Sequence, residues 1–319
     1  MDRGGKVYVA GHRGLAGSAI VRALRAEGFG NVVTRPHAEL ELRDGAQVEA
    51  FFSRERPEFV FLAAAKVGGI VANDTYRGDF IYDNLAIQTN VIEAARRHGV
   101  RRLVFLGSSC VYPRDCPQPI REEYLLTGPL EETNKPYAVA KIAGIEMCRA
   151  YNRQHGTRFL CAMPTNLYGP GDNYDPLNSH VLPALIRRAH ETKLSGASEM
   201  VVWGTGRPRR EFLHADDMAR ACVLLLQLDD ARFDAFLRDA AAPALVNIGC
   251  GRDQSIEEIA RTVCRVVGFQ GRLAFDSSKP DGTPRKMLDV SRITSLGWAP
   301  RIALEEGLRG AYEEFRARG

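Results

Sequence analysis

The chain has 319 residues, of which 45% are hydrophobic and 26% are charged, and its formal net charge is +4. These values are ordinary for a globular protein, and the length predicts one large domain with a smaller lobe. Because acidic and basic residues are interspersed, the small positive excess argues against nucleic acid or a membrane as the partner and suits a small anionic ligand.

Seven cysteines are scattered along the chain, and no two of them form a CxxC pair. An odd number in a chain of this size argues against a disulfide framework and indicates a reduced, cytoplasmic compartment. We expect no bound metal. The N-terminal residues lead into a strand with no apolar signal region, and no apolar run approaches the roughly 18 residues of a membrane span.

Apolar strand-like runs alternate with helix-length amphipathic stretches through the first half of the chain. The predicted strands are Lys6–Ala10, Asn31–Thr34, Phe59–Ala63, Leu103–Leu106 and Phe159–Met163. Helices are predicted between them, near residues 15–28, 45–56, 84–99 and 137–155. Alternation at this spacing is typical of βαβ units, so we predict an α/β protein with a Rossmann-like, doubly wound parallel sheet.

The second half is less regular, with glycine and proline clustered at residues 164–176. The elements predicted there are a helix near 180–193, a short strand ending at Trp203, a polar loop, a helix at 215–228, an ambiguous helix or loop at 230–243, the strand Val246–Ile248 returning to the main sheet, and helices near 255–267 and 302–317, which flank the charged loop Lys279–Lys286.

This pattern predicts two domains. We place a dinucleotide-binding Rossmann domain at residues 1–170, with 213–250 returning to it. A smaller, discontinuous α/β lobe at 171–212 and 251–319 would bind the substrate. It is expected at the carboxyl edge of the sheet, where open parallel sheets bind ligands.

A glycine motif directly follows the first predicted strand and opens a helix. Its residues are Gly11, His12, Arg13, Gly14, Leu15, Ala16 and Gly17. Gly11 permits a tight turn, Gly14 lets the backbone approach a diphosphate, and Gly17 lets the helix pack closely on the sheet. Free amides at the start of the helix favour the anion, so the motif predicts a dinucleotide site.

The end of the second predicted strand distinguishes between the two nicotinamide cofactors. NAD enzymes place an acid there, whereas this chain has Arg35 and no acid before Glu39. The guanidinium of Arg35, together with that of Arg13, suits a 2′-phosphate, which predicts NADP(H). The alternative is that Arg35 is a solvated loop residue.

Small side chains follow the third predicted strand at Ala63 and Ala64. Bulkier residues would collide with a cofactor lying across the sheet edge, although alanines also occur there as ordinary packing.

Tyr137 and Lys141 lie one helical turn apart, on the helix predicted after the fourth strand. A nearby ammonium favours the phenolate and lowers the tyrosine pKa from its ordinary value of about 10, which permits proton exchange near neutral pH. Ser108, at the carboxyl end of the fourth strand, can donate a hydrogen bond to a substrate carbonyl. The alternative is that Ser108 and Ser109 only open the next loop.

In this order, Ser108, Tyr137 and Lys141 resemble the triad of the short-chain dehydrogenases/reductases. Over nearly the whole chain the sequence resembles one family of the extended members, the GDP-L-fucose synthases. The segments that carry the resemblance are Gly11–Gly14, Ala63–Ile70, Gly107–Pro113, Pro136–Ala138, Lys141–Gly144, Met163–Pro170, Asn178–His180, Arg210–His214 and Lys279–Lys286.

The resemblance implies a two-step reaction on GDP-4-keto-6-deoxymannose. Carbons 3 and 5 would be epimerised, and NADPH would then reduce the carbon 4 ketone to give GDP-L-fucose. Cys110 and His180 would serve as base and acid, in either assignment, because their ordinary pKa values of about 8.5 and 6.5 bracket neutral pH. Without the resemblance, a lone cysteine is usually a small buried residue and a lone histidine is usually structural.

The resemblance also implies the contact residues. Besides Gly11–Gly17 and Arg35, the cofactor would contact Ala63, Ala64, Leu106, Gly107, Lys141, Pro164, Thr165, Asn166, Leu167 and His180. The substrate would contact Ser108, Ser109, Arg188, Trp203, Arg210 and Asp281. No role follows for Lys66, which either contacts a ligand or organises a glycine-rich turn.

Three other functions are compatible with parts of the pattern. A sugar 4,6-dehydratase shares the triad but needs an Asp-Glu pair where this chain has Ser109 and Cys110. A nucleoside-sugar 4-epimerase, the main alternative, needs neither Cys110 nor His180. A non-catalytic dinucleotide sensor would typically have lost Tyr137 or Lys141. We also predict a homodimer, paired through the helices near 84–99 and 137–155.

Overall fold

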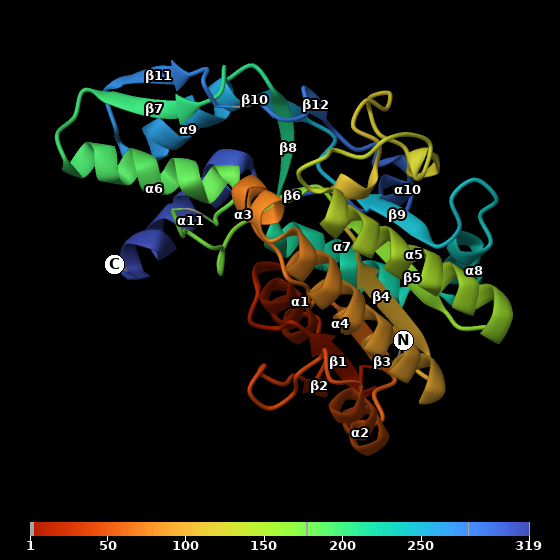
Figure 1. Cartoon of the computed structure of the whole chain (residues 1–319). Helices are drawn as coiled ribbons and strands as arrows, with labels where there is room; N and C mark the ends of the chain where they lie inside the picture. Colours follow the sequence, from red (N-terminus) through yellow and green to blue (C-terminus); the bar gives the residue numbers. More distant parts are fainter. Residues whose placement is uncertain (1–2, 177, 280, 319) are drawn as a thin grey trace.

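The computed structural model describes residues 3–176, 178–279 and 281–318. Residues 1, 2 and 319 of the predicted domains, and Pro280 of the predicted charged loop, lie outside this range. At the centre of the molecule lies a parallel sheet of six strands in the order β2-β1-β3-β4-β5-β9 (Figure 1). In chain order the strands are β1 (Val7–Ala10), β2 (Val32–Val33), β3 (Phe59–Leu62), β4 (Arg102–Leu106), β5 (Phe159–Pro164) and β9 (Leu245–Ile248).

Helices cover both faces of this sheet, which explains why its strands are apolar without alternation. One face packs on α1 (Leu15–Ala26) and α7 (Ala215–Gln227), through buried residues such as Ile20 and Met218. The other face packs on α2 (Gly45–Glu55), α4 (Arg77–Arg97) and α5 (Lys135–His155). The predicted fold class, a Rossmann-like doubly wound sheet, is therefore confirmed.

The topology also locates the ligand edge of the sheet. The chain passes from β1 outward to β2 and then crosses to β3 on the other side of β1. Ligands of open α/β sheets bind outside the carboxyl ends of the strands at such a switch point. The N-terminus of α1 lies there.

A second group of elements stands over this carboxyl edge (Figure 1). A small sheet contains β10 (Asp253–Ser255), β8 (Arg209–His214) and β12 (Arg285–Lys286), with β6 (Asn166–Tyr168) paired to β8. The pair β7 (Glu199–Trp203) and β11 (Arg272–Asp276) packs with α6 (Val181–Leu194), α9 (Ile256–Val267) and α11 (Leu304–Arg318) around a separate core. The division at 170/171, 212/213 and 250/251 stays a prediction.

Shorter elements complete the chain. They are α3 (Ile70–Thr75), α8 (Asp230–Leu237), α10 (Ser291–Thr294) and two single-turn helices, η1 (Ser109–Val111) and η2 (Glu122–Tyr124). In the described part of the chain, no helix has the length and apolar character needed to cross a membrane.

Most predicted boundaries agree with the structure to within a few residues, and Val246–Ile248 does return to the main sheet beside β5. Two expectations were wrong. The segment between Trp203 and α7 was predicted as a polar loop, but it contains β8, which gains hydrogen-bond partners from β6, β10 and β12. The helix predicted near 84–99 begins at Arg77, with Asp79 in its first turn, where a negative charge stabilises the helix.

Candidate active site

The turn between β1 and α1 is shaped by its glycines. Gly11 has a φ of +83°, a conformation that side chains disfavour, and its carbonyl accepts a hydrogen bond of 3.0 Å from the amide of Gly14. A Cβ atom at Gly17 would clash with the carbonyl oxygen of Gly11. A Cβ atom at Gly14 would come no closer than 3.5 Å to that oxygen and faces open space. The residues therefore leave the start of α1 accessible to an anion.

The end of β3 packs directly against this turn. An added Cβ at Gly11 would lie 2.7 Å from backbone atoms of Ala64. Ala63 and Ala64 are both partly buried. The small side chains at the end of β3 thus keep the edge of the sheet open beside the glycine turn.

Of the two predicted 2′-phosphate residues, Arg35 lies just beyond the end of β2 and Arg13 lies in the turn between β1 and α1. Arg13 is exposed, while Arg35 is partly buried and already engaged with protein groups. Arg35 donates to the carbonyl of Thr34 at 2.7 Å and to the carboxylate of Glu55 at 2.7 Å. The pKa of His12 is lowered by desolvation of its imidazole ring and by the positive charge of Arg13.

The predicted triad comes together at the ends of β4 and α5. The side chains of Ser108 and Tyr137 lie within interaction distance of each other. The ammonium of Lys141 is buried, donates to the carbonyl of Leu106 at 2.8 Å and lies 4.7 Å from the centroid of the Phe105 ring. Sequence-distant residues thus converge at one point on the carboxyl edge of the sheet.

The electrostatics of the triad differ from the sequence-based expectation. Burial raises the pKa of Tyr137, the negative charge of a Cys110 thiolate raises it further, and the hydrogen bond with Ser108 lowers it. Burial lowers the pKa of Lys141 to about 8. We expected Lys141 to lower the pKa of Tyr137, but burial of the phenol dominates and raises it, although the Lys141 ammonium lies 5.8 Å from the centroid of the Tyr137 ring.

Cys110 lies in η1, two residues after Ser108, whose hydroxyl accepts a 3.4 Å hydrogen bond from the Cys110 amide. His180 immediately precedes α6, on a turn that is attached to the Rossmann side through the hydrogen bond from the Gly69 amide to the Asn178 carbonyl. Burial raises the pKa of Cys110. Desolvation lowers the pKa of His180, although the residue as a whole is exposed.

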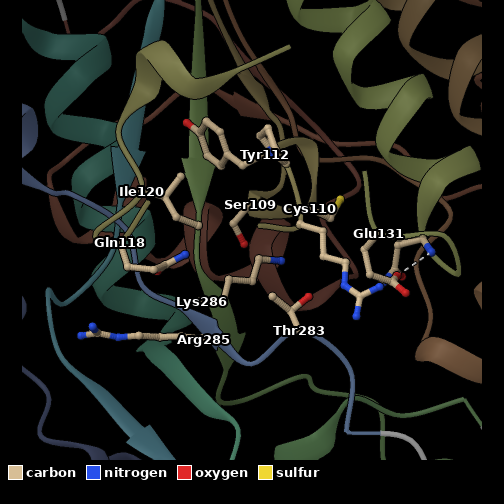
Figure 2. Close-up of a pocket in the computed structure, with 12 residues that line it drawn as sticks. Ser109, Cys110, Tyr112, Gln118, Ile120, Glu131, Thr283, Arg285 and Lys286 are labelled. Atoms are coloured by element: carbon tan, nitrogen blue, oxygen red, sulfur yellow. Dashed lines mark hydrogen bonds between the residues drawn. The ribbon is translucent and has the colours of Figure 1, made fainter. Parts of the chain in front are cut away.

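The positive charge of Lys286, on β12, acts on both Cys110 and His180. This charge lowers the pKa of Cys110 and of His180, and burial lowers the pKa of Lys286 itself. Lys286 and Cys110 line the same small pocket with Ser109 and Glu131 (Figure 2). Two groups able to exchange protons therefore share one cationic neighbour.

Apart from Ser108 and Ser109, the predicted substrate-binding residues belong to the group of elements that stands over the carboxyl edge of the sheet. The guanidinium of Arg188 lies 4.9 Å from the centroid of the Trp203 ring, which is 49% exposed, and donates to the carbonyl of Val201 at 2.8 Å. Arg210 donates to the carbonyl of Arg209 at 2.8 Å. Burial lowers the pKa of both Arg188 and Arg210, as expected for cations held partly out of water.

Asp281 is exposed, but its carboxylate already accepts hydrogen bonds from the neighbouring loop. It accepts hydrogen bonds from the amide of Thr205 at 2.7 Å and from the hydroxyl of Thr205 at 2.8 Å. In this arrangement Asp281 organises the turn after Trp203, and its charge raises the pKa of Arg210. The neighbouring Arg209 pairs with Asp253 at 3.0 Å.

Comparisons with known proteins connect this geometry to a family. The model of the NAD dependent epimerase/dehydratase family matches residues 7–238. "GDP-L-fucose synthase 1" of Arabidopsis thaliana is 58% identical over 314 residues, which cover 98% of this chain and 94% of that protein. The chain is a member of the GDP-L-fucose synthase family. The Escherichia coli (strain K12) member is 53% identical, over 97% of this chain and 96% of its own length.

Solved structures support the same placement. A GDP-6-OMe-4-keto-L-xylo-heptose reductase from C. jejuni superposes with a TM-score of 0.93 at 39% identity, covering 100% of this chain and 99% of its own. A GDP-L-fucose synthetase from Naegleria fowleri bound to NADP has a TM-score of 0.86 at 27% identity, covering 100% and 96%. The family therefore includes a member solved with NADP.

Sequence reasoning missed Lys286 as a site residue of this GDP-L-fucose synthase family member. It treated Lys279–Lys286 as a charged loop that carried the resemblance. In the structure, β12 runs parallel to β8, with Lys286 in register with Arg210. A two-residue strand leaves no periodic signal in the sequence, and its partner lies far away in the chain.

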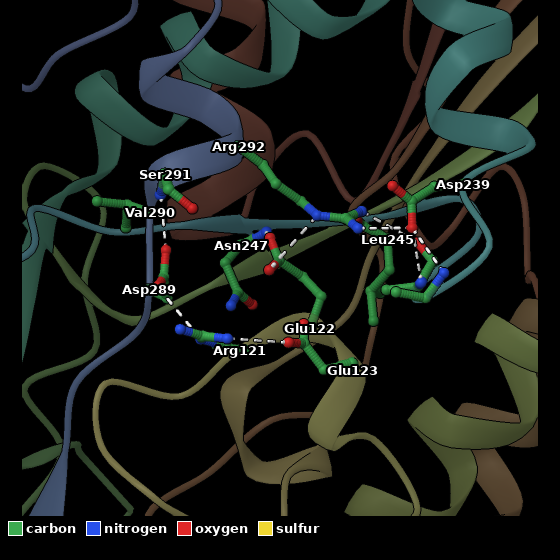
Figure 3. Close-up of polar contacts among 12 residues, drawn as sticks. Arg121, Glu122, Glu123, Asp239, Leu245, Asn247, Asp289, Val290, Ser291 and Arg292 are labelled. Atoms are coloured by element: carbon green, nitrogen blue, oxygen red, sulfur yellow. Dashed lines mark hydrogen bonds and ion pairs between the residues drawn. The ribbon is translucent and has the colours of Figure 1, made fainter.

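The loop that follows Cys110 is fixed by a polar network that the sequence did not predict either. The amide of Asn247 donates to the carboxylate of Glu122 at 2.9 Å, and the Asn247 side chain donates to the carbonyl of Ile120 at 2.9 Å. Arg292 lies 3.7 Å from the same carboxylate (Figure 3). Burial raises the pKa of Glu122 to about 7.

Proposed function

We propose that this chain converts GDP-4-keto-6-deoxymannose to GDP-L-fucose, by epimerisation at carbons 3 and 5 followed by NADPH-dependent reduction at carbon 4. The observation that carries the proposal is the placement of Cys110, beside Ser108 and Tyr137, in a protein of this family. The names of the relatives at 58% and 53% identity support the substrate. Among the described residues, no group of three or more His, Cys, Asp or Glu side chains is arranged to hold a metal ion.

The residues present fit NADP(H). A Cβ atom at Gly14 would meet only the Gly11 carbonyl oxygen within 4 Å, at 3.5 Å, so the start of α1 keeps space for a diphosphate, while the missing side chain at Gly11 lets the turn pack against Ala64. Arg13 and Arg35 stand where a 2′-phosphate would need a cation, and Arg35 would exchange Glu55 for the phosphate. When bound, NADPH supplies the hydride for carbon 4.

The epimerisation would use Cys110 and His180. A ketone at carbon 4 acidifies the protons on carbons 3 and 5, so one group removes a proton and the other returns one to the opposite face. The hydrogen-bonding hydroxyls of Ser108 and Tyr137 would stabilise the negative charge that develops on the carbonyl oxygen. The cation of Lys286 adds positive potential at the same place.

The reduction would use the triad. Tyr137 would give its proton to the carbon 4 oxygen, in line with the raised pKa that keeps its phenol protonated before reaction. Lys141, held by the Leu106 carbonyl, would hydrogen-bond the nicotinamide ribose. Arg188, Arg210 and Trp203 would hold the GDP end of the substrate, through charge on the diphosphate and packing on the base.

The proposal is tested by giving purified protein NADPH and GDP-4-keto-6-deoxymannose and determining product stereochemistry by NMR. NADPH consumption with GDP-L-fucose as product supports both half-reactions. Consumption with a product that keeps the D-configuration would leave a reductase and reject Cys110 and His180 as epimerising groups. No consumption, with NAD retained through purification, would favour the 4-epimerase alternative.

The role of Cys110 has its own test. In the variant Cys110→Ser we expect deuterium incorporation from solvent at carbons 3 and 5 to fall far more than NADPH affinity. Turnover equal to that of the unmodified chain would remove Cys110 from the mechanism.

We also propose a homodimer in the cytoplasm. Tyr82 on α4 and Val139 on α5 are 66% and 40% exposed, and the two helices lie side by side, which would give an apolar pairing surface. All seven cysteines are free thiols, in keeping with a reducing compartment. Light scattering that gives a monomer mass at micromolar concentration would reject the dimer.

A further inference from the structure

We propose that Glu211 is a positioning residue, whose buried carboxylate holds the strand that carries Lys286 in register with Arg210 at the substrate cleft. The inference deepens the proposed function and rests on it for the identity of the substrate. Glu211 itself faces away from the cleft, because neighbouring side chains on a strand alternate between its two faces.

The carboxylate of Glu211 is fully buried, at 0% exposure, and binds two chain segments at once. One oxygen accepts a 2.6 Å hydrogen bond from the amide of Gly251, in the loop after β9. The other accepts a 2.9 Å hydrogen bond from the amide of Leu288, two residues beyond Lys286. The site is tightly fitted, since a Cβ atom at Gly249 would overlap with this carboxylate.

The main chain of Glu211 joins a third segment. Its carbonyl accepts a 3.2 Å hydrogen bond from the hydroxyl of Thr165 and a 2.8 Å hydrogen bond from the side chain of Asn166. These two residues belong to the segment predicted to contact the cofactor. Glu211 therefore connects the cofactor side to the substrate side, through its carbonyl in one direction and its carboxylate in the other.

β12 needs such an anchor because it is short. It has only the residues Arg285 and Lys286, and its register with β8 pairs Lys286 with Arg210. Beyond it, the amide of Ile120 donates to the Met287 carbonyl at 2.8 Å, while the Glu211 bond secures the next residue. Without that bond, the position of Lys286 relative to Cys110 would depend on the loop after Cys110.

The chemistry of the site explains why an acid is used. Burying a carboxylate is unfavourable, and burial raises the pKa of Glu211, an effect that the two amide donors counter. A carboxylate offers two acceptors without any donor, so it matches two converging N–H groups. An amide in its place presents an NH₂ group to one of them and cannot keep both bonds.

Asp217 provides a matched control. It is also a fully buried carboxylate, and it accepts hydrogen bonds from the amides of Arg301 and Ile302 at 3.0 and 2.9 Å. It joins α7 to the segment before α11, and it also pairs with Arg220. Like Glu211 it is a buried carboxylate that accepts from two main-chain amides, although both amides share its Oδ2 while its Oδ1 pairs with Arg220, and it holds neither Lys286 nor Arg210.

The experiment compares Glu211→Gln with Asp217→Asn in the full-length chain. Both should melt at a lower temperature. Only Glu211→Gln should raise KM for GDP-4-keto-6-deoxymannose, by about tenfold, as expected for a lost hydrogen bond to a charged group. The Kd for NADPH should stay unchanged, because the bonds to Thr165 and Asn166 come from the main chain.

Alkylation of Cys110 gives a second readout that needs no substrate. The charge of Lys286 lowers the pKa of Cys110, so displacement of Lys286 in Glu211→Gln should move the pH profile of iodoacetamide labelling upward. Labelling is followed by mass spectrometry of the Cys110 peptide, and Asp217→Asn should leave the profile in place. An unchanged profile and KM in Glu211→Gln would overturn the proposal.

The design also covers a variant that does not fold and a chain that does not turn over the substrate. If Glu211→Gln does not fold, the same measurements on Glu211→Asp, which keeps the charge but shortens the side chain, apply the same criteria. If the unmodified chain does not turn over the GDP-sugar, the proposed function fails, while the labelling profile still decides the role of Glu211.

Discussion

The cofactor end and the substrate face of this protein are constructed in different ways. The cofactor end is made by main-chain atoms of one short segment, Gly11–Gly17, whose shape follows from its own residues. The substrate face is made by side chains such as Arg188, Arg210 and Lys286, which come from α6, β8 and β12. The first construction depends on the absence of side chains, and the second depends on buried groups elsewhere that keep distant segments in register.

The junction of the two regions is the catalytic triad, and its loss should have the largest effect. Tyr137→Phe removes the proton donor to the carbon 4 oxygen and should lower kcat about 10²- to 10⁴-fold. The fold should be kept, because the variant loses only the hydroxyl and keeps the aromatic ring. Stopped-flow measurement of NADPH oxidation checks this. A rate within threefold of the unmodified chain would place proton donation elsewhere.

On the cofactor side, Gly17→Ala should be the most damaging small change. The added methyl group clashes with the carbonyl of Gly11 and must shift the turn, at a cost of roughly 3 kcal/mol. We expect NADPH affinity to fall about 100-fold and GDP affinity to stay the same. Fluorescence titration measures the first and calorimetry the second. Equal losses for both ligands would mean that the two regions are not built independently.

The reciprocal change is Arg210→Ala on the substrate side. Loss of a charge-assisted hydrogen bond to a diphosphate should cost about 2 kcal/mol, or about 30-fold in GDP affinity, with NADPH affinity unchanged. Arg207→Ala serves as the matched control, since that side chain is exposed and donates to the hydroxyl of Thr205. If both variants bind GDP equally, Arg210 is not a ligand of the diphosphate.

The smallest expected effect concerns the network around Glu122. Its carboxyl has a pKa of about 7 in the folded protein against an ordinary value near 4.5, because burial outweighs the Asn247 amide and Arg292. Between these two values the folded state holds a proton that the unfolded state releases, so stability from this group is present below pH 4.5 and is lost as pH rises through 7.

Glu122→Gln removes that titration. Relative to the unmodified chain, the free energy of unfolding of the variant should rise by about 2 kcal/mol between pH 5 and pH 8, measured by urea denaturation. Taking the difference between the two proteins cancels other titrating groups, such as Asp172, whose pKa is also raised to about 7. Parallel pH profiles would show that Glu122 stays ionised in the folded state.

The same contrast explains what the sequence could predict. Strands such as Phe59–Leu62 and Phe159–Pro164 are continuous buried runs, so their number, order along the chain and parallel class followed from local pattern. The glycine turn and the spacing of Tyr137 and Lys141 are local as well. These features could be recognised without knowing any contact between distant segments.

The features that escaped prediction depend on such contacts. Arg209–Glu211 is polar and looked like a loop, yet pairing with two partner strands, β10 and β12, makes it part of β8. Lys286 reaches the site only through the register of β12 with β8. The burial of Tyr137, which raises its pKa although the Lys141 ammonium lies 5.8 Å from its ring centroid, is likewise a matter of three-dimensional packing.

The hydrogen bond between the amide of Gly69 and the carbonyl of Asn178 has a consequence for how this sequence can evolve. Gly69 is so close to the His180 turn that an added Cβ would lie 2.7 Å from the carbonyl oxygen of Ser179. A mutation at position 69 would therefore displace a catalytic candidate on the other lobe. We expect positions 69 and 178–180 to change together among descendants of a common ancestor, so that the glycine-rich segment after Lys66 and the His180 turn evolve as one unit although more than a hundred residues separate them.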